Sequence, residues 1–129
     1  MTWRIVAFVA LGGAIGSVLR YIISFSMSLR VGAGFPWATF LINVAGSFLI
    51  GVVTEIALQR TSWIGPELRL FLAAGVLGGF TTFSTFSLEL VGLIGERAPA
   101  AALVYAAGSV ILGFAAAFGG LFLARAIVA

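Results

Sequence analysis

The chain lacks most of the side chains that enzyme active sites use. Its 129 residues include no cysteine, histidine, lysine or aspartate, so the acidic groups are four glutamates and the basic groups are seven arginines. This inventory excludes thiolate and lysine nucleophiles, imidazole acid–base catalysis, disulfides and metal sites built from cysteine or histidine. We therefore expect that the protein is not an enzyme.

Charge of either sign is scarce as well. Charged residues make up 9% of the chain and hydrophobic residues 62%, with a mean hydropathy of +1.23. Soluble domains are about a quarter charged and about half apolar, so this composition predicts an integral membrane protein. The formal net charge of +3 comes from scattered arginines, which do not form the basic stripe of a nucleic-acid-binding protein.

Four hydrophobic runs follow one another with short polar connections between them. They cover residues 5–27, 38–58, 70–94 and 100–127. Each is close to the length of about 20 residues that a membrane helix needs, and the first is too long for the apolar core of a signal peptide. The sequence predicts one all-α transmembrane domain over residues 1–129, with four helices and both termini on the same side.

The third run contains an unusual concentration of small and hydroxylated residues. Gly78 and Gly79 are followed by hydroxyl side chains at positions 81, 82, 84, 85 and 87. Glycine permits unusual backbone angles, and hydroxyls can satisfy backbone groups that an opened helix releases. We expect a broken helix near residues 78–82. Non-helical backbone at membrane depth is tolerated only inside protein or beside a watery cavity, so the break indicates a conduction or binding site.

Aromatic rings alternate with these hydroxyls. Phe80, Phe83 and Phe86 recur at every third position, so on a helix they share one stripe. Such a stripe is either lipid-facing bulk or, together with Thr82 and Thr85, the wall of a narrow polar pathway. Ring edges carry partial positive charge and can face an anion without trapping it as a lysine would.

Polar groups in the other spans leave more than one interpretation open. Asn43 in the second span is either a hydrogen-bonded link between helices or a donor in a pathway. Tyr105 and Ser109 share a face of the fourth span, where buried hydroxyls commonly bond to a neighbouring carbonyl. Arg20 and Glu89 lie toward the same membrane end and are expected either to pair or to leave Arg20 in an electropositive vestibule.

The remaining charges bear on topology. Glu55 is expected to meet Arg60 or the membrane interface. The side of the termini carries four arginines and the other side two, a weak positive-inside bias; the residues are Arg4, Arg60, Arg69 and Arg125 against Arg30 and Arg97. Four spans cannot easily enclose a pore, so we expect an oligomer, and the weak bias favours an antiparallel homodimer.

Three segments resemble the Fluc/CrcB family of fluoride channels. They are GGFTTFSTF at 78–86, LINVAGSFLIG at 41–51 and GGAIGSVLRY at 12–21, and the resemblance covers all four spans. It implies a dual-topology antiparallel homodimer in the bacterial inner membrane with two fluoride pores. It also implies passive export of fluoride, which protects the cytoplasm.

The resemblance further implies roles for individual residues. Phe83 and Phe86 match the phenylalanines that line the pore, Asn43 matches a fluoride donor, and Ser109 and Tyr105 match a serine and tyrosine of the fourth span. The carbonyls of Gly78 and Thr81 resemble those that hold a central structural Na⁺. Two other classes remain: a small proton-coupled multidrug exporter, which needs a carboxylate at mid-membrane, and a non-conducting structural subunit.

Overall fold

The computed structural model describes residues 2–32 and 34–128, which fold into helices joined by short connections. The helices are α1 (Trp3–Ser28), α2 (Trp37–Gln59), α3 (Pro66–Leu70), the π-helix η1 (Phe71–Leu77), α4 (Gly78–Phe80), α5 (Phe83–Gly95) and α6 (Pro99–Val128). The segments α3, η1, α4 and α5 form one hydrophobic stretch, Pro66–Gly95, which we call the third span. Counted this way, four helices are long and apolar enough to cross a membrane. The predicted set of four membrane helices with a broken third member is confirmed.

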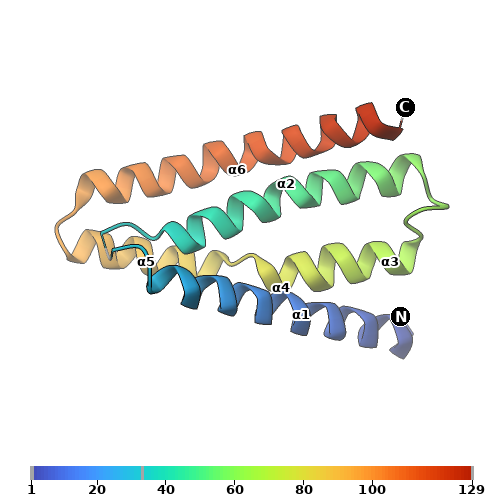
Figure 1. The fold of residues 1–129 in the computed structure, drawn as a ribbon, viewed down its shortest axis with the longest axis horizontal. Coiled ribbons are helices and arrows are strands. Elements are labelled where there is room, and N and C mark those ends of the chain that lie inside the picture. The colour runs from blue at the N-terminus through green and yellow to red at the C-terminus, as the bar shows by residue number, and fades with distance from the viewer. Residues whose placement is uncertain (1, 33, 129) are drawn as a thin grey trace.

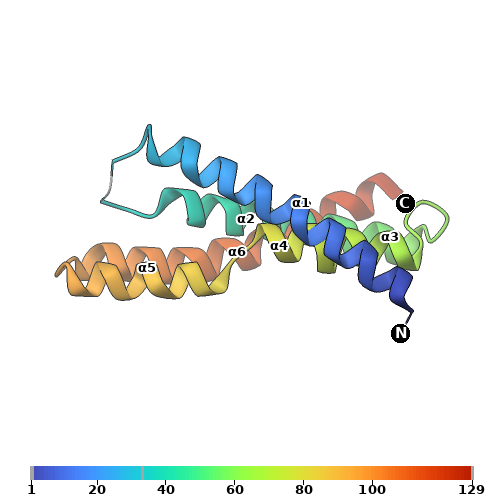
Figure 2. The ribbon, with the colours of Figure 1, turned by 90° about the horizontal axis from the view of Figure 1, so that it is seen from below.

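The helices form an elongated bundle with both described chain ends at the same end (Figure 1). The connection from α2 to α3 lies at that end, and the connections from α1 to α2 and from α5 to α6 lie at the other. α2 packs along α6, whereas α1 packs mainly against η1 and α4. Figure 2 shows α5 running beside α6 while the end of α1 diverges from α5.

Prolines mark the beginnings of three helices. Pro36 directly precedes α2, Pro66 is the first residue of α3, and Pro99 is the first residue of α6. The fixed φ of proline suits a first helical turn, where its missing N–H would have had no helical partner.

Glycines allow α1 to cross the third span at close range. A Cβ added to Gly12 would lie 2.9 Å from the backbone nitrogen of Val76, and one added to Gly16 would overlap the Val76 carbonyl. From the other side, a Cβ on Gly75 would lie 3.0 Å from the Cα of Gly12. Gly12 and Gly16, four residues apart on one face of α1, thus bring the two backbones together.

α2 and α6 also meet through glycine, and an ion pair joins them near the end that carries the termini. A Cβ on Gly120 would overlap the carbonyl of Phe48, whereas one on the neighbouring Gly119 would meet nothing within 4 Å. Glu55 is buried and accepts a hydrogen bond of 2.8 Å from Nε of Arg125.

The expected partner of Glu55 was therefore wrong. Arg60 follows the last residue of α2, and its Nη2 donates to the Val128 carbonyl at 2.6 Å. Arg125, on the antiparallel helix α6, lies beside the carboxylate instead. A buried carboxylate needs such a partner, and helix packing determined which arginine supplied it.

Candidate functional site

The helix of the third span opens at two threonines. Thr81 and Thr82 have extended backbone conformations, with φ and ψ of −83° and 159° and of −152° and 119°. Gly78 remains helical, and no glycine among residues 2–32 and 34–128 has a positive φ. The break lies within the predicted range, but the part of the reason that rested on glycine was wrong. β-branched residues adopt the extended conformation, while the glycines give room for α1.

The same two threonines satisfy the helix ends that the break creates. The Thr81 hydroxyl donates to the carbonyl of Leu77 at 2.9 Å, and the Thr81 N–H donates to the same oxygen at 3.0 Å. On the other side, Thr82 is the N-cap of α5 and its hydroxyl accepts from the N–H of Thr85 at 3.2 Å. A hydroxyl N-cap of this kind stabilises a helix start.

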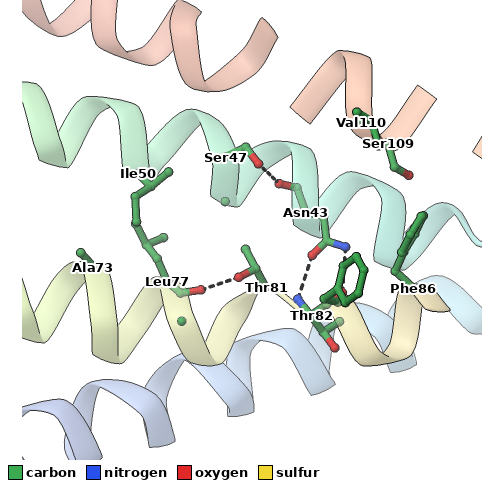
Figure 3. A pocket seen from close by; sticks show the side chains of 13 residues that line it. Asn43, Ser47, Ile50, Ala73, Leu77, Thr81, Thr82, Phe86, Ser109 and Val110 are labelled. Carbon is green, nitrogen blue, oxygen red and sulfur yellow. Dashed lines mark hydrogen bonds between the residues drawn. The ribbon is translucent and has the colours of Figure 1, made fainter. Parts of the chain in front are cut away.

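Asn43 holds the extended backbone from the neighbouring helix α2. Its Nδ2 donates to the Thr82 carbonyl at 3.0 Å, and its Oδ1 accepts from the Thr82 N–H at 2.8 Å, as Figure 3 shows. Ser47 lies one turn later and donates to the Asn43 carbonyl at 2.7 Å. An amide has two donor hydrogens, so Asn43 retains one beyond the bond to Thr82.

A cavity of about 360 Å³ lies beside the break. Figure 3 shows it between α2, α6 and the third span. Its lining includes Asn43, Thr82, Phe83, Phe86 and Ser109 of the predicted site. The Ser109 hydroxyl is buried and has no hydrogen-bond partner in residues 2–32 and 34–128. The cavity therefore combines an amide, two rings and an uncommitted hydroxyl.

The aromatic part of the site contains two rings rather than three. The Phe83 and Phe86 centroids lie 5.7 Å apart, and Phe83 is 80% exposed in the single chain. Phe80 lies before the break, near Gly46 of α2, because the extended threonines interrupt the stripe that a continuous helix would have formed. Phe80 is outside the residues that line this cavity.

Thr85 and Glu89, which the sequence analysis named, belong to a second cavity of about 510 Å³. Thr39, Thr85 and Glu89 contribute to its lining. Glu89 accepts hydrogen bonds from the hydroxyls of Thr39 at 2.9 Å and Tyr105 at 2.6 Å. Tyr105 is completely buried, so its hydroxyl is committed to the carboxylate.

Two contacts connect the cavities. The Thr82 hydroxyl donates to the Thr85 hydroxyl at 3.0 Å. The rings of Phe86 and Tyr105 lie with centroids 5.0 Å apart. Polar side chains thus follow α5 from the break toward Glu89.

Arg20 lies apart from both cavities, and of the two alternatives expected for it, the pairing with Glu89 was wrong. Its Nε donates to the Gly79 carbonyl at 3.1 Å. Glu89 is already satisfied by Thr39 and Tyr105, whereas the end of α4 presents a free carbonyl to α1. Arg20 therefore contacts the break itself.

Some carbonyls of the break have no donor. Within the described chain, the oxygens of Gly78 and Thr81 accept no hydrogen bond, whereas those of Leu77, Gly79 and Thr82 do. Unpartnered carbonyl oxygens are ligands that a hard cation prefers. The two positions predicted to hold Na⁺ are thus chemically suited to it.

Thr39 and Ser47 were given no role in the sequence analysis, although their spacing from Asn43 is a signal for both. Thr39, Asn43 and Ser47 are spaced four apart, so they share one face of α2. Thr39 contacts Glu89, and Ser47 lines the cavity at the break. A search for polar residues at this spacing would have found both.

Known proteins with similar sequences are numerous. A family model described as "CrcB-like protein, Camphor Resistance (CrcB)" matches residues 7–121. A protein of Rhizobium meliloti named "Fluoride-specific ion channel FluC" is 46% identical over 123 residues, which is 95% of this chain and 98% of that protein. A protein of the same name from Thermus thermophilus is 49% identical over 120 residues, 93% of this chain and 94% of that protein.

Proposed function

The chain belongs to the CrcB family, and from this premise we propose that it is a passive, fluoride-selective channel that lets fluoride leave the cytoplasm. It is a multi-pass protein of the bacterial inner membrane, and its family is one of ion channels rather than enzymes. The observation that carries the proposal is the cavity at the break, where the Asn43 amide, the Ser109 hydroxyl and the rings of Phe83 and Phe86 meet at membrane depth.

Fluoride can cross a membrane only if the protein replaces part of its water shell. A bare ion in a low-dielectric medium would cost tens of kcal/mol, so donors along the path are necessary. Asn43 has one amide hydrogen to give, Ser109 has a hydroxyl without a partner in the described residues, and the two rings offer their edges. These donors are weak enough to release the ion again.

The two sides of the break favour charges of opposite sign. α5 begins at Phe83, and the positive end of its dipole lies beside the cavity, which favours an anion there. On the other side α4 ends at Phe80, and the Gly78 and Thr81 carbonyls, which accept no hydrogen bond from the described residues, favour a cation. The carbonyls of Gly78 and Thr81 would hold a structural Na⁺, which would supply positive charge between the opened helix ends.

The Na⁺ proposal is tested by changing the ion. Thermal stability and fluoride flux of the purified protein should both fall when Na⁺ is replaced by a large organic cation, and both should recover on its return. If neither stability nor flux changes when Na⁺ is replaced, the protein does not bind a structural Na⁺.

A second copy completes the pathway in this proposal. Phe83 is 80% exposed beside polar groups that lipid tails would leave unsatisfied, so another protein surface is needed to cover them. The weak arginine bias favours an antiparallel homodimer with two pores. Added lysines at either end should bias insertion, and mixing oppositely biased variants should restore flux; full activity of one strongly biased variant alone would exclude dual topology.

Efflux from liposomes tests the function. Purified protein should release fluoride, measured with a fluoride electrode, only when a potassium ionophore balances the charge, and should retain chloride. Chloride released as fast as fluoride would contradict the proposed selectivity. Proton-coupled efflux of an organic cation would support the exporter class instead.

A further inference from the structure

We propose that Arg20 is a positioning residue that holds the carbonyl end of the broken helix and supplies a fixed positive charge there. Its role thereby differs from that of an arginine that attracts anions at a channel mouth. The inference rests partly on the proposed function, because one of its tests measures fluoride flux.

The contact is made deep in the membrane-spanning part of α1. Arg20 is the eighteenth of the 26 residues of this helix, and its side chain is partly buried. Nε donates to the Gly79 carbonyl at 3.1 Å, and the hydroxyl of Ser17, one turn earlier, points at the same oxygen from 3.5 Å. An arginine at this depth is costly unless it has a partner, and its partner here is backbone.

Glycine brings the two helices close enough for this contact. A Cβ on Gly79 would lie 2.5 Å from the carbonyl oxygen of Gly13, and one on Gly16 would lie 2.8 Å from the backbone nitrogen of Phe80. Larger residues at these positions would push α1 away from the break. The hydrogen bond of Arg20 therefore depends on the close glycine contact between α1 and the third span.

The Gly79 carbonyl is one of the last in the helical run from Pro66 to Phe80. Such carbonyls have no partner within their own helix and form the negative end of its dipole. Basic residues near a helix end commonly supply the missing hydrogen bond. Here the basic residue comes from a neighbouring helix, because the sequence just after Gly79 is Phe-Thr-Thr and offers no cation.

This placement has a consequence for an anion in the cavity at the break. Gly78, Thr81 and Thr82 line that cavity, so the carbonyl end of α4 borders it and would repel fluoride. The Arg20 guanidinium offsets this repulsion from behind the backbone. Salt screens a partly buried charge only a little. At high salt, by contrast, an exposed charge at a channel mouth no longer attracts anions.

Carbonyl chemical shifts test the contact without any use of fluoride. Glycine labelled at the carbonyl carbon and phenylalanine labelled with ¹⁵N give one NMR cross-peak for each Gly-Phe pair, and the chain has three: 34–35, 79–80 and 113–114. In Arg20→Leu the 79–80 carbonyl should move upfield, since it loses a charged donor, and in Arg20→Lys it should move less. A peak that stays in place would overturn the contact.

Two further variants keep the result interpretable. Arg20→Gln removes the charge but retains a donor group, and it replaces Arg20→Leu in the NMR measurement if Arg20→Leu does not fold. Arg30→Leu removes an exposed arginine near the end of α1 and should leave the 79–80 peak unchanged. A shift equal in Arg30→Leu and Arg20→Leu would reflect general disturbance and would count against the proposal.

Fluoride efflux at two salt concentrations tests the charge. Arg20→Gln should lose roughly tenfold in flux, and Arg20→Lys should retain most of it. The deficit should persist in about 1 M impermeant salt, where the Debye length is about 3 Å. A deficit that disappears in high salt would assign Arg20 to the channel mouth and overturn the proposal.

The two measurements also separate this inference from the proposed function. If the wild-type chain releases no fluoride but the 79–80 peak responds, the fluoride proposal fails and the placement of Arg20 stands. If wild-type flux is strong and Arg20→Gln conducts normally, the charge role is wrong.

Discussion

The crossing of α1 with the third span and the pairing of α2 with α6 use the same kind of contact. In both, a helix backbone lies so close to glycine that an added Cβ would overlap a carbonyl: that of Val76 at Gly16, and that of Phe48 at Gly120. Yet α2 and α6 are unbroken, whereas the third span opens at two extended threonines. Close helix packing by itself therefore does not open a backbone.

What differs is the supply of polar side chains around the backbone. At the break, Thr81, Thr82, Asn43 and Arg20 all bond to main-chain groups. Between α2 and α6, the ion pair of Glu55 with Arg125 joins two side chains, near the end that carries the termini. A pattern of glycines thus predicts a contact, and hydroxyl or amide groups at the same depth predict an opened helix.

The largest change should follow the loss of Asn43. Asn43→Leu leaves the N–H and C=O of Thr82 without partners, at about 1–3 kcal/mol for each group. Fluoride efflux per reconstituted protein should fall by at least about thirtyfold, while the protein remains folded.

Ser47→Ala is the matched control. It changes the same helix face and removes a cavity-wall hydroxyl whose hydrogen bond goes to the Asn43 carbonyl and not to the extended backbone, so its effect should be smaller. Equal efflux from Asn43→Leu and wild type would show that conduction does not need the hydrogen bonds of Asn43 to the Thr82 backbone. The polar contacts at the break would then have no role in conduction.

Replacing the rings of the cavity should have the next largest effect. Phe83→Ile and Phe86→Ile each remove an aromatic edge and should lower efflux by about twofold to tenfold, with the protein purifying intact. Phe118→Ile removes a ring of α6 that lines neither cavity and should conduct normally. Normal flux in both cavity variants would exclude a phenyl-lined pathway.

Two neighbouring glycines of the third span differ in the space around them. A Cβ on Gly79 would lie 2.5 Å from the Gly13 carbonyl oxygen, whereas one on Gly78 would make an ordinary contact of 3.7 Å. Gly79→Ala should therefore reduce efflux several-fold, and Gly78→Ala should reduce it less. The measurement is efflux normalised to folded protein.

The corresponding pair on α6 should affect stability alone. Gly120→Ala overpacks α6 against α2 and should cost about 1–3 kcal/mol of stability, whereas Gly119→Ala should be neutral in a thermal unfolding assay. Flux per folded channel should be normal in both. A flux loss in Gly120→Ala as large as that in Gly79→Ala would mean that the two crossings do not differ in function.

Hydropathy and the glycine and hydroxyl pattern were enough to predict the helices and the position of the break. They were not enough to predict which group bonds to which. Glu55 pairs with Arg125 and Glu89 with Tyr105 because of the way antiparallel helices align, which no local pattern encodes. The π-helix Phe71–Leu77 likewise has no evident local signal.

The candidate site was predicted in part for the wrong reasons. Gly78 and Gly79 were expected to provide backbone freedom, but Gly78 remains helical and Gly79 provides space for α1. Pairing of Arg20 with Glu89 was one expected alternative, because the sequence places both residues toward the same membrane end and does not reveal the Gly79 carbonyl opposite Arg20. Such errors are expected wherever a role depends on the neighbouring helix.

The central claim is that fluoride passes through the cavity at the break, and the absence of cysteine allows a direct test. Ser109→Cys places a single thiol in the cavity wall, and Ile111→Cys places one on an exposed position outside it. Each variant is treated with methyl methanethiosulfonate, checked for complete reaction by intact mass and reconstituted for fluoride efflux. Modified Ser109→Cys should lose its flux and modified Ile111→Cys should keep it; fully modified Ser109→Cys that conducts as before would contradict the claim.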